Sequence, residues 1–128
     1  VWLVGTSRGT QSVAFVATEL GRSEGPDGIV LTSTIVTDDK GRPVPAMPVE
    51  KLRIPVLVVH HEQDGCRLCA FGDIPALMSK LSDAPRKKLL SFTGGEDRGD
   101  PCEAAGHHGF NGVEREVVAQ TASWILAK

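Results

Sequence analysis

Short, unbroken apolar runs along the chain are separated by segments in which apolar residues recur every three or four positions. An unbroken apolar run is typical of a parallel strand that is covered on both faces, and three-and-four spacing is typical of an amphipathic helix. The runs predict buried strands at positions 1–4, 28–33, 54–61 and 87–92, the last of them nearer the edge of a sheet. The spacing predicts helices at positions 11–20, 70–81 and 113–127.

The alternation of these elements predicts an α/β fold in three layers, with a parallel open sheet of about four strands and flanking helices. A chain of 128 residues is enough for one domain, which we expect to span residues 1–128. Two long irregular segments remain, at 34–51 and 93–106. The first is rich in aspartate, glycine and proline, and it either lines a site or forms a solvated surface loop.

The composition is that of an ordinary soluble globular protein, with 41% hydrophobic residues, 23% charged residues and a net charge of −2. The basic residues are scattered, so we expect neither a nucleic-acid partner nor a membrane surface. We also expect no cofactor and no bound metal. The chain opens directly on an apolar strand, which suggests that sequence upstream has been removed or was never there. The lack of a targeting segment therefore says nothing about localisation.

A serine lies at the apex of a predicted strand, sharp turn and helix, within Gly5-Thr6-Ser7-Arg8-Gly9. The pattern G-x-S-x-G is weak by itself, but its position between a strand and a helix strengthens it. Such a turn holds the serine in a strained conformation and brings strand and helix close together. We expect Gly5 and Gly9 to provide the room that this approach requires.

Three candidate residues follow the carboxyl ends of predicted strands. Ser7 follows the first strand, Asp64 the third and His108 the fourth. In an open parallel sheet these ends meet at one edge, where ligands bind. We therefore expect the three side chains to lie together.

The order Ser7, Asp64, His108, with the elbow at Ser7 and a histidine before Gly-Phe, resembles the carboxyl-terminal half of the α/β-hydrolase superfamily. The resemblance covers nearly the whole chain and is weakest at 34–51. It implies an esterase-like enzyme for acyl substrates, with Ser7 as nucleophile, His108 as base and Asp64 orienting the base. The backbone N–H of Arg8 would stabilise the oxyanion. In the family a second donor comes from an earlier loop, which this sequence lacks.

Other roles are open for the serine and the carboxylate. Ser7 could be a helix N-cap, which is the commonest role of serine at such a position. Glu62 competes with Asp64, and either could be a solvated loop carboxylate. The Asp64-Gly65 pair suits a turn directly after a strand, and together with the family pattern it favours Asp64.

The histidines also leave alternatives. His107 competes with His108 as the base, and the Gly-Phe pair that follows His108 favours the latter. His107 would then line the pocket or support the base. His60 and His61, at the end of a predicted strand, are expected to be structural or pocket-lining.

The three cysteines, Cys66, Cys69 and Cys102, lie on the two loops that also carry Asp64 and His108. A disulfide between these loops is the favoured interpretation, with Cys66–Cys102 first and Cys69–Cys102 second. It would indicate an oxidising compartment, such as the periplasm or the extracellular space. A zinc site formed by the cysteines and a histidine, a redox pair in Cys-x-x-Cys, and three unpaired thiols are the alternatives.

The first strand predicts a second kind of behaviour. In the related fold, strands that this sequence lacks cover its outer edge. An uncovered apolar strand is a site of association. We therefore expect the chain to self-associate through residues 1–4, or to pair there with a separate amino-terminal piece. Self-association would accompany a weakly active or inactive hydrolase fragment.

Overall fold

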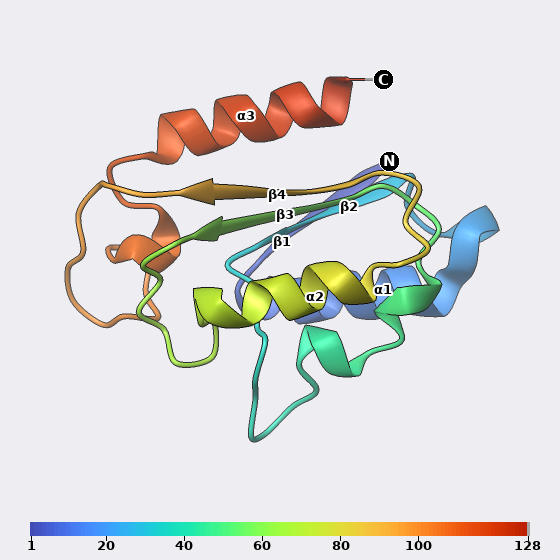
Figure 1. Cartoon of the computed structure of the whole chain (residues 1–128), viewed down its shortest axis with the longest axis horizontal. Helices are drawn as coiled ribbons and strands as arrows, with labels where there is room; N and C mark the ends of the chain where they lie inside the picture. Colours follow the sequence, from blue (N-terminus) through green and yellow to red (C-terminus); the bar gives the residue numbers. More distant parts are fainter. Residues whose placement is uncertain (128) are drawn as a thin grey trace.

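The computed structural model of the protein describes residues 1–127, which form one sheet of four strands with helices on both of its faces (Figure 1). The strands are β1 (Trp2–Thr6), β2 (Gly28–Thr32), β3 (Val56–His61) and β4 (Lys87–Phe92). The helices are α1 (Arg8–Glu24), α2 (Ile74–Lys80) and α3 (Glu114–Leu126). Short 3-10 turns are η1 (Val44–Ala46), η2 (Val49–Lys51), η3 (Phe71–Asp73) and η4 (His107–Gly109).

The sheet is parallel throughout, and its strand order β1-β2-β3-β4 follows the chain. Helices α1 and α2 and the irregular segment 33–55 lie on one face, and α3 lies on the other (Figure 1). The predicted three-layer α/β arrangement is therefore confirmed. Helix α1 runs past the predicted end at residue 20, but Gly21 interrupts it with a non-helical φ of 68°.

The two faces of the central strands bury different side chains, because successive side chains in a strand point to opposite sides. Ile29, Leu31, Val56 and Val58 pack against α1, α2 and segment 33–55. The alternate strand residues Val30, Leu57 and Val59 point to the opposite face. There they form a second cluster with Phe92, Phe110 and Val117. Burying each of these strand residues stabilises the fold by about 1.5–3 kcal/mol, which explains why β2 and β3 are apolar without alternation.

The prediction of a buried first strand is wrong. Strand β1 lies at the edge of the sheet, and Val4 is 57% exposed while only Gly5 of this strand is buried. The uncovered outer edge expected for residues 1–4 is confirmed, since β1 pairs with β2 alone among the described strands. Strand β4 forms the other edge, as predicted. Among residues 1–127, no helix has the length and apolar character needed to cross a membrane.

Candidate active site

Ser7 occupies the sharp turn between β1 and α1 and has a positive φ of 55° with ψ of −118°. Such values are uncommon for a residue other than glycine and indicate local strain. Gly5 makes the turn possible, since a Cβ at Gly5 would lie 2.3 Å from the carbonyl oxygen of Gly9. The expectation for Gly9 is wrong, because a Cβ there would meet no atom within 4 Å. Of these two glycines, only Gly5 therefore lacks room for a side chain, because the backbone of Gly9 occupies the space beside it.

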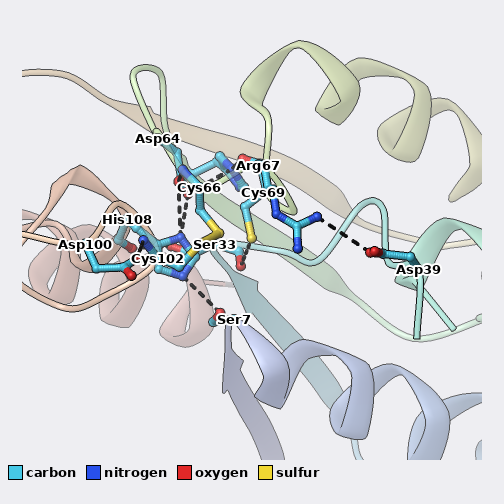
Figure 2. The surroundings of a disulfide bond; sticks show 11 residues. Ser7, Ser33, Asp39, Asp64, Cys66, Arg67, Cys69, Asp100, Cys102 and His108 are labelled. Atoms are coloured by element: carbon cyan, nitrogen blue, oxygen red, sulfur yellow. Dashed lines mark hydrogen bonds and ion pairs between the residues drawn. A yellow bond between two sulfur atoms is a disulfide. The ribbon is translucent and has the colours of Figure 1, made fainter. Parts of the chain in front are cut away.

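Ser7, His108 and Asp64 form a continuous series of hydrogen bonds (Figure 2). The Nε2 atom of His108 lies 2.9 Å from Ser7 Oγ, and its Nδ1 lies 2.9 Å and 3.1 Å from the two carboxylate oxygens of Asp64. A carboxylate only accepts hydrogen bonds, so Nδ1 carries the proton and Nε2 is free to accept the hydroxyl hydrogen of Ser7. His108 is 101 positions from Ser7 and 44 positions from Asp64 in the chain, and only the tertiary fold brings the three residues together.

The site is buried around His108 and Asp64 and is open at Ser7. His108 is 3% exposed and the Asp64 side chain is fully buried, whereas Ser7 is partly exposed. Ser7 stands at the N-cap position of α1, but its side chain makes no capping hydrogen bond. Its hydroxyl instead contacts His108.

The competing residues are directed elsewhere. Glu62 accepts a hydrogen bond from Ser91 at 2.9 Å and has no contact with a histidine among the bonds of residues 1–127. His107 stacks on His61 with ring centroids 4.2 Å apart, and its buried Nδ1 has no partner within the described chain. The structure therefore brings Asp64 and His108 to Ser7 and leaves Glu62 and His107 outside the series.

The loop that carries His108 is shaped by turns that require small residues. His108 lies in η4, and a Cβ at Gly109 would come within 2.2 Å of the carbonyl oxygen of Ala104. Phe110 follows with a positive φ of 59° and packs edge-on against Phe92 at 6.2 Å. The Gly-Phe pair thus turns the chain sharply and anchors it in the core directly after the histidine.

The start of α1 offers a hydrogen-bond donor beside Ser7. Within residues 1–127, the backbone N–H of Arg8 makes no hydrogen bond to another residue. It stands at the positive end of the helix dipole, where negative charge is stabilised. This group is therefore placed to interact with an oxygen that becomes negative near Ser7.

The side chain of Arg8 ties the start of α1 to segment 33–55. It forms an ion pair with Asp38, which also accepts hydrogen bonds from Gln11 at 2.9 Å and from the backbone N–H of Lys40 at 3.1 Å. These hydrogen bonds, that of Gln11 first, lower the pKa of Asp38 from its usual 3.8 to about 2, although burial acts in the opposite direction. Segment 33–55 is thereby fixed next to the serine.

A disulfide joins Cys66 to Cys102, as the sequence favoured (Figure 2). It links the loop of Asp64 to the loop that precedes His108, and the N–H of Cys66 donates to Asp64 Oδ1 at 2.9 Å. Cys69 is a free, buried thiol. Burial first, and then the negative charge of Asp64, raises the pKa of Cys69 to about 12. The Cys69–Cys102 alternative is therefore wrong.

The alternative uses of the cysteines meet a physical obstacle. Ligand atoms of Cys66, Cys69 and His108 lie within 4.8 Å of one another, a spacing that could suit a metal ion. Cys66, however, is bonded to Cys102, and both ring nitrogens of His108 are engaged by Ser7 and Asp64. Because a metal needs thiolates and a free imidazole nitrogen, these donors do not fit one in this state. A redox pair is excluded in the same way, since Cys66 is not bonded to Cys69.

Two further residues lie next to this series: Ser33, which the sequence pattern did not single out, and His60, which is buried as expected of a structural residue. Ser33 Oγ donates to the carbonyl oxygen of His108 at 2.6 Å, and His60 Nε2 lies 3.4 Å from Asp64 Oδ2. Ser33 directly follows β2, so the rule that gathered Ser7, Asp64 and His108 at one sheet edge applies to it equally. Its position directly after a predicted strand could therefore have identified Ser33 as a candidate site residue.

In comparisons with known proteins, no protein-family model and no curated protein matches the chain. The function therefore has to be argued from the site.

Proposed function

We propose that the protein is a serine hydrolase of the α/β-hydrolase type that acts on an ester or a related acyl substrate. One observation carries the proposal: Ser7 Oγ, His108 and Asp64 are hydrogen-bonded in series, with both bonds of the imidazole at 2.9 Å. This is the arrangement in which an imidazole can accept the serine proton while a carboxylate fixes its tautomer. The strained turn at Ser7 is a second support, because such turns present a nucleophile away from the backbone.

The reaction would proceed in two steps through an acyl-enzyme. Ser7 Oγ attacks the acyl carbon while its proton moves to Nε2 of His108, and the carbonyl oxygen becomes an oxyanion near the N–H of Arg8. The C–O bond to the alcohol then breaks, and His108 returns the proton to the departing oxygen. In the second step water attacks the acyl carbon, His108 again takes and returns a proton, and Ser7 and a carboxylic acid are released.

The contribution of each group can be estimated from general magnitudes. Acid–base catalysis by a placed histidine typically contributes about 10²–10⁴-fold. One oxyanion donor contributes about 10²–10³-fold. A site with Ser7, His108 and the Arg8 N–H should therefore accelerate hydrolysis measurably even with one oxyanion donor.

The direct test is covalent labelling with a fluorophosphonate, which phosphonylates an activated serine and releases fluoride. We expect one phosphonate per chain, located at Ser7 by peptide mapping, and hydrolysis of a short-chain aryl ester by the unlabelled protein. Ser7→Ala should lose both. The matched control is Ser12→Ala, an exposed serine on α1, which should keep both. A folded wild-type chain that takes up no phosphonate would refute the proposal.

The disulfide bears on where such an enzyme would work. Cys102 is exposed, so a reducing environment could open its bond to Cys66. We propose an oxidising compartment, the periplasm or the extracellular space, as its working environment.

A second candidate is association through the open edge of β1, with weak or no hydrolase activity. It is favoured by the exposure of Val4 (57%) on the edge strand β1 and of Val1 (83%) directly before that strand. A groove of about 400 Å³ runs between this strand and α3, with Val4 and Val118 among its lining residues. We propose a second copy of the chain as the occupant, because an unpaired edge strand can pair with an identical one.

Sedimentation velocity at micromolar concentration tests this second candidate. A dimer that Val4→Lys converts to a monomer would support it, since a charge on an edge strand opposes pairing. A monomeric wild-type chain, or a dimer that Val4→Lys leaves intact, would refute it. Binding of a separate amino-terminal segment instead of a second copy would also count against self-association.

A further inference from the structure

We propose that Ser33 and His60 are positioning residues of the active site, which hold the base and the acid through a closed ring of polar contacts, four of them hydrogen bonds and the fifth the 3.4 Å contact between His60 and Asp64. The proposal rests on the proposed function, since it concerns the same Ser7, His108 and Asp64. Neither residue touches the reacting serine, and each acts through a partner.

Ser33 holds the main chain of His108. It is fully buried at the end of β2, where its N–H donates to the carbonyl oxygen of Val59 at 2.9 Å. Its hydroxyl donates to the carbonyl oxygen of His108 at 2.6 Å. Ser33 also has a positive φ of 49°, which a residue other than glycine rarely adopts without a compensating interaction. The central sheet thus holds the point of the backbone from which the imidazole projects.

His60 holds the acid. It is fully buried near the end of β3, and its Nδ1 faces the backbone N–H of Thr34 at 3.4 Å. Since Nδ1 accepts there, the ring proton lies on Nε2, which points at the carbonyl oxygen of Cys69 at 2.7 Å and at Asp64 Oδ2 at 3.4 Å. Burial lowers the pKa of His60, so the ring is a neutral donor. The carboxylate therefore has His60 on one side and His108 on the other.

Cys69 closes the ring between these two residues. Its carbonyl oxygen accepts the hydrogen bond of His60. Its thiol donates to the carbonyl oxygen of Ser33 at 3.4 Å (Figure 2). The contacts then run from His108 to Asp64, His60, Cys69 and Ser33, and back to His108. A displacement of either the base or the acid would stretch several bonds of the ring.

The alternative is that these bonds only satisfy buried polar groups, as such groups require in any core. The two interpretations differ in what a mutation changes. A bond that only stabilises the fold affects the melting temperature and leaves each folded molecule fully active. A bond that positions the triad slows the reaction of Ser7 in molecules that are folded.

The first experiment compares Ser33→Ala with Thr34→Val, which each remove one buried hydroxyl from neighbouring residues. The Thr34 hydroxyl is a matched control, because it is buried and has no hydrogen-bond partner within residues 1–127. Readouts are the second-order rate of fluorophosphonate labelling at Ser7, kcat and KM for an aryl ester, and the melting temperature. For Ser33→Ala we expect labelling and kcat to fall at least tenfold with KM unchanged, since misplacement of about 1 Å can cost 10²-fold. Thr34→Val should keep the wild-type rates.

The second experiment tests His60 with a variant that keeps a side-chain donor and one that does not. We expect His60→Leu to slow labelling, and His60→Gln, whose amide N–H can still reach the acid, to restore part of the rate. Circular dichroism establishes the folded fraction, and rates are normalised to it. If His60→Leu does not fold, His60→Gln and Ser33→Ala still decide the matter.

The outcomes separate this proposal from the proposed function. A wild-type chain that is not labelled at Ser7 refutes the hydrolase itself. A labelled wild type whose Ser33→Ala and His60 variants react as fast as Thr34→Val, after normalisation, refutes only the positioning role. A slower reaction in folded Ser33→Ala, with KM unchanged, supports it.

Discussion

Two long irregular segments leave the carboxyl edge of the sheet, and they are held in different ways. Segment 33–55 is built into the core, where Val44 and Val49 are fully buried and Leu52 is 3% exposed. Residues 93–105 of the other segment are all exposed. Yet the exposed segment leads into His108, the residue whose position matters most for the proposed chemistry.

Individual cross-links hold the exposed segment in place of apolar burial. Cys102 is bonded to Cys66, the N–H of His107 donates to Asp97 at 3.0 Å, and the N–H of Glu96 donates to the carbonyl oxygen of Asn111 at 2.9 Å. The contacts of a buried apolar side chain are shared among several neighbours, whereas each of these cross-links is a single bond that one substitution removes. The position of segment 93–106, which leads into His108, should therefore be more sensitive to the loss of one cross-link than the position of segment 33–55.

The largest effect is expected at the hydrogen bond between His108 and Asp64. Asp64→Asn should lower kcat by about 10⁴-fold, because an amide no longer fixes the tautomer of His108. The Asn oxygen can still accept from the N–H of Cys66, so the melting temperature should change little. Steady-state kinetics and thermal unfolding measure the two effects. A variant that keeps most of its kcat would show that Asp64 does not orient the base.

The next largest effect is expected from the disulfide. A cross-link between residues 36 positions apart restricts the unfolded chain by an amount equivalent to about 4 kcal/mol of stability. The double variant Cys66→Ala, Cys102→Ala should lose up to that amount in denaturant unfolding. It should also lose activity per folded molecule, because the loop before His108 is released. Reduced wild type is the matched control and should behave like the double variant; full activity in both would contradict the role assigned to this cross-link.

Segment 33–55 should show the opposite pattern. Val49→Ala removes apolar surface from the core and should cost about 2 kcal/mol of unfolding free energy. Because the cost is spread over the core, kcat of the folded variant should equal that of wild type. Denaturant unfolding and kinetics on the same sample measure both quantities. An equal loss of kcat would mean that the two segments do not differ as described.

The smallest effect is expected from Asp38, whose hydrogen bonds with Gln11 and Lys40 and ion pair with Arg8 hold segment 33–55 to α1. Its folded pKa of about 2 lies below the usual value of 3.8. The ionised carboxylate therefore contributes stability above about pH 4, and this contribution is lost as the pH falls toward 2. Asp38→Asn should flatten the decline in melting temperature between pH 4 and 2.

The control for that measurement is Asp39→Asn, which removes an exposed partner of Arg67 at 3.6 Å. Exposed ion pairs contribute little, so its profile should follow wild type. If both variants follow wild type, the hydrogen bonds of Asp38 do not stabilise the fold.

The sequence predicted the elements best where burial is complete. The run at 54–61 became β3 (Val56–His61), and the strand at 28–33 became β2 (Gly28–Thr32). The order and the edge position of Ser7, Asp64 and His108 followed from the parallel sheet, and the disulfide followed from the loops that carry them. These predictions held because they depend on periodicity and topology, which are local properties of the chain or simple consequences of its order.

The predictions that failed depended on how segments of the chain pack against one another in the folded protein. The exposed side chain of Val4 and the open space beside Gly9 are set by how the segments pack in the folded chain. The same is true of Ser33, whose hydroxyl meets a carbonyl group 75 positions away.

The sequence by itself determined which side chains reach the carboxyl edge of the sheet, because the apolar pattern shows where each strand ends and its loop begins. Only the tertiary structure decided which of them touch. A hydrogen bond requires a donor and an acceptor within about 3 Å of each other and in the correct orientation. The adjacent residues His107 and His108 therefore have different partners, although they are one position apart. That choice depends on the turn at Gly109 and the cross-link at Cys102, which hold the loop in a single position.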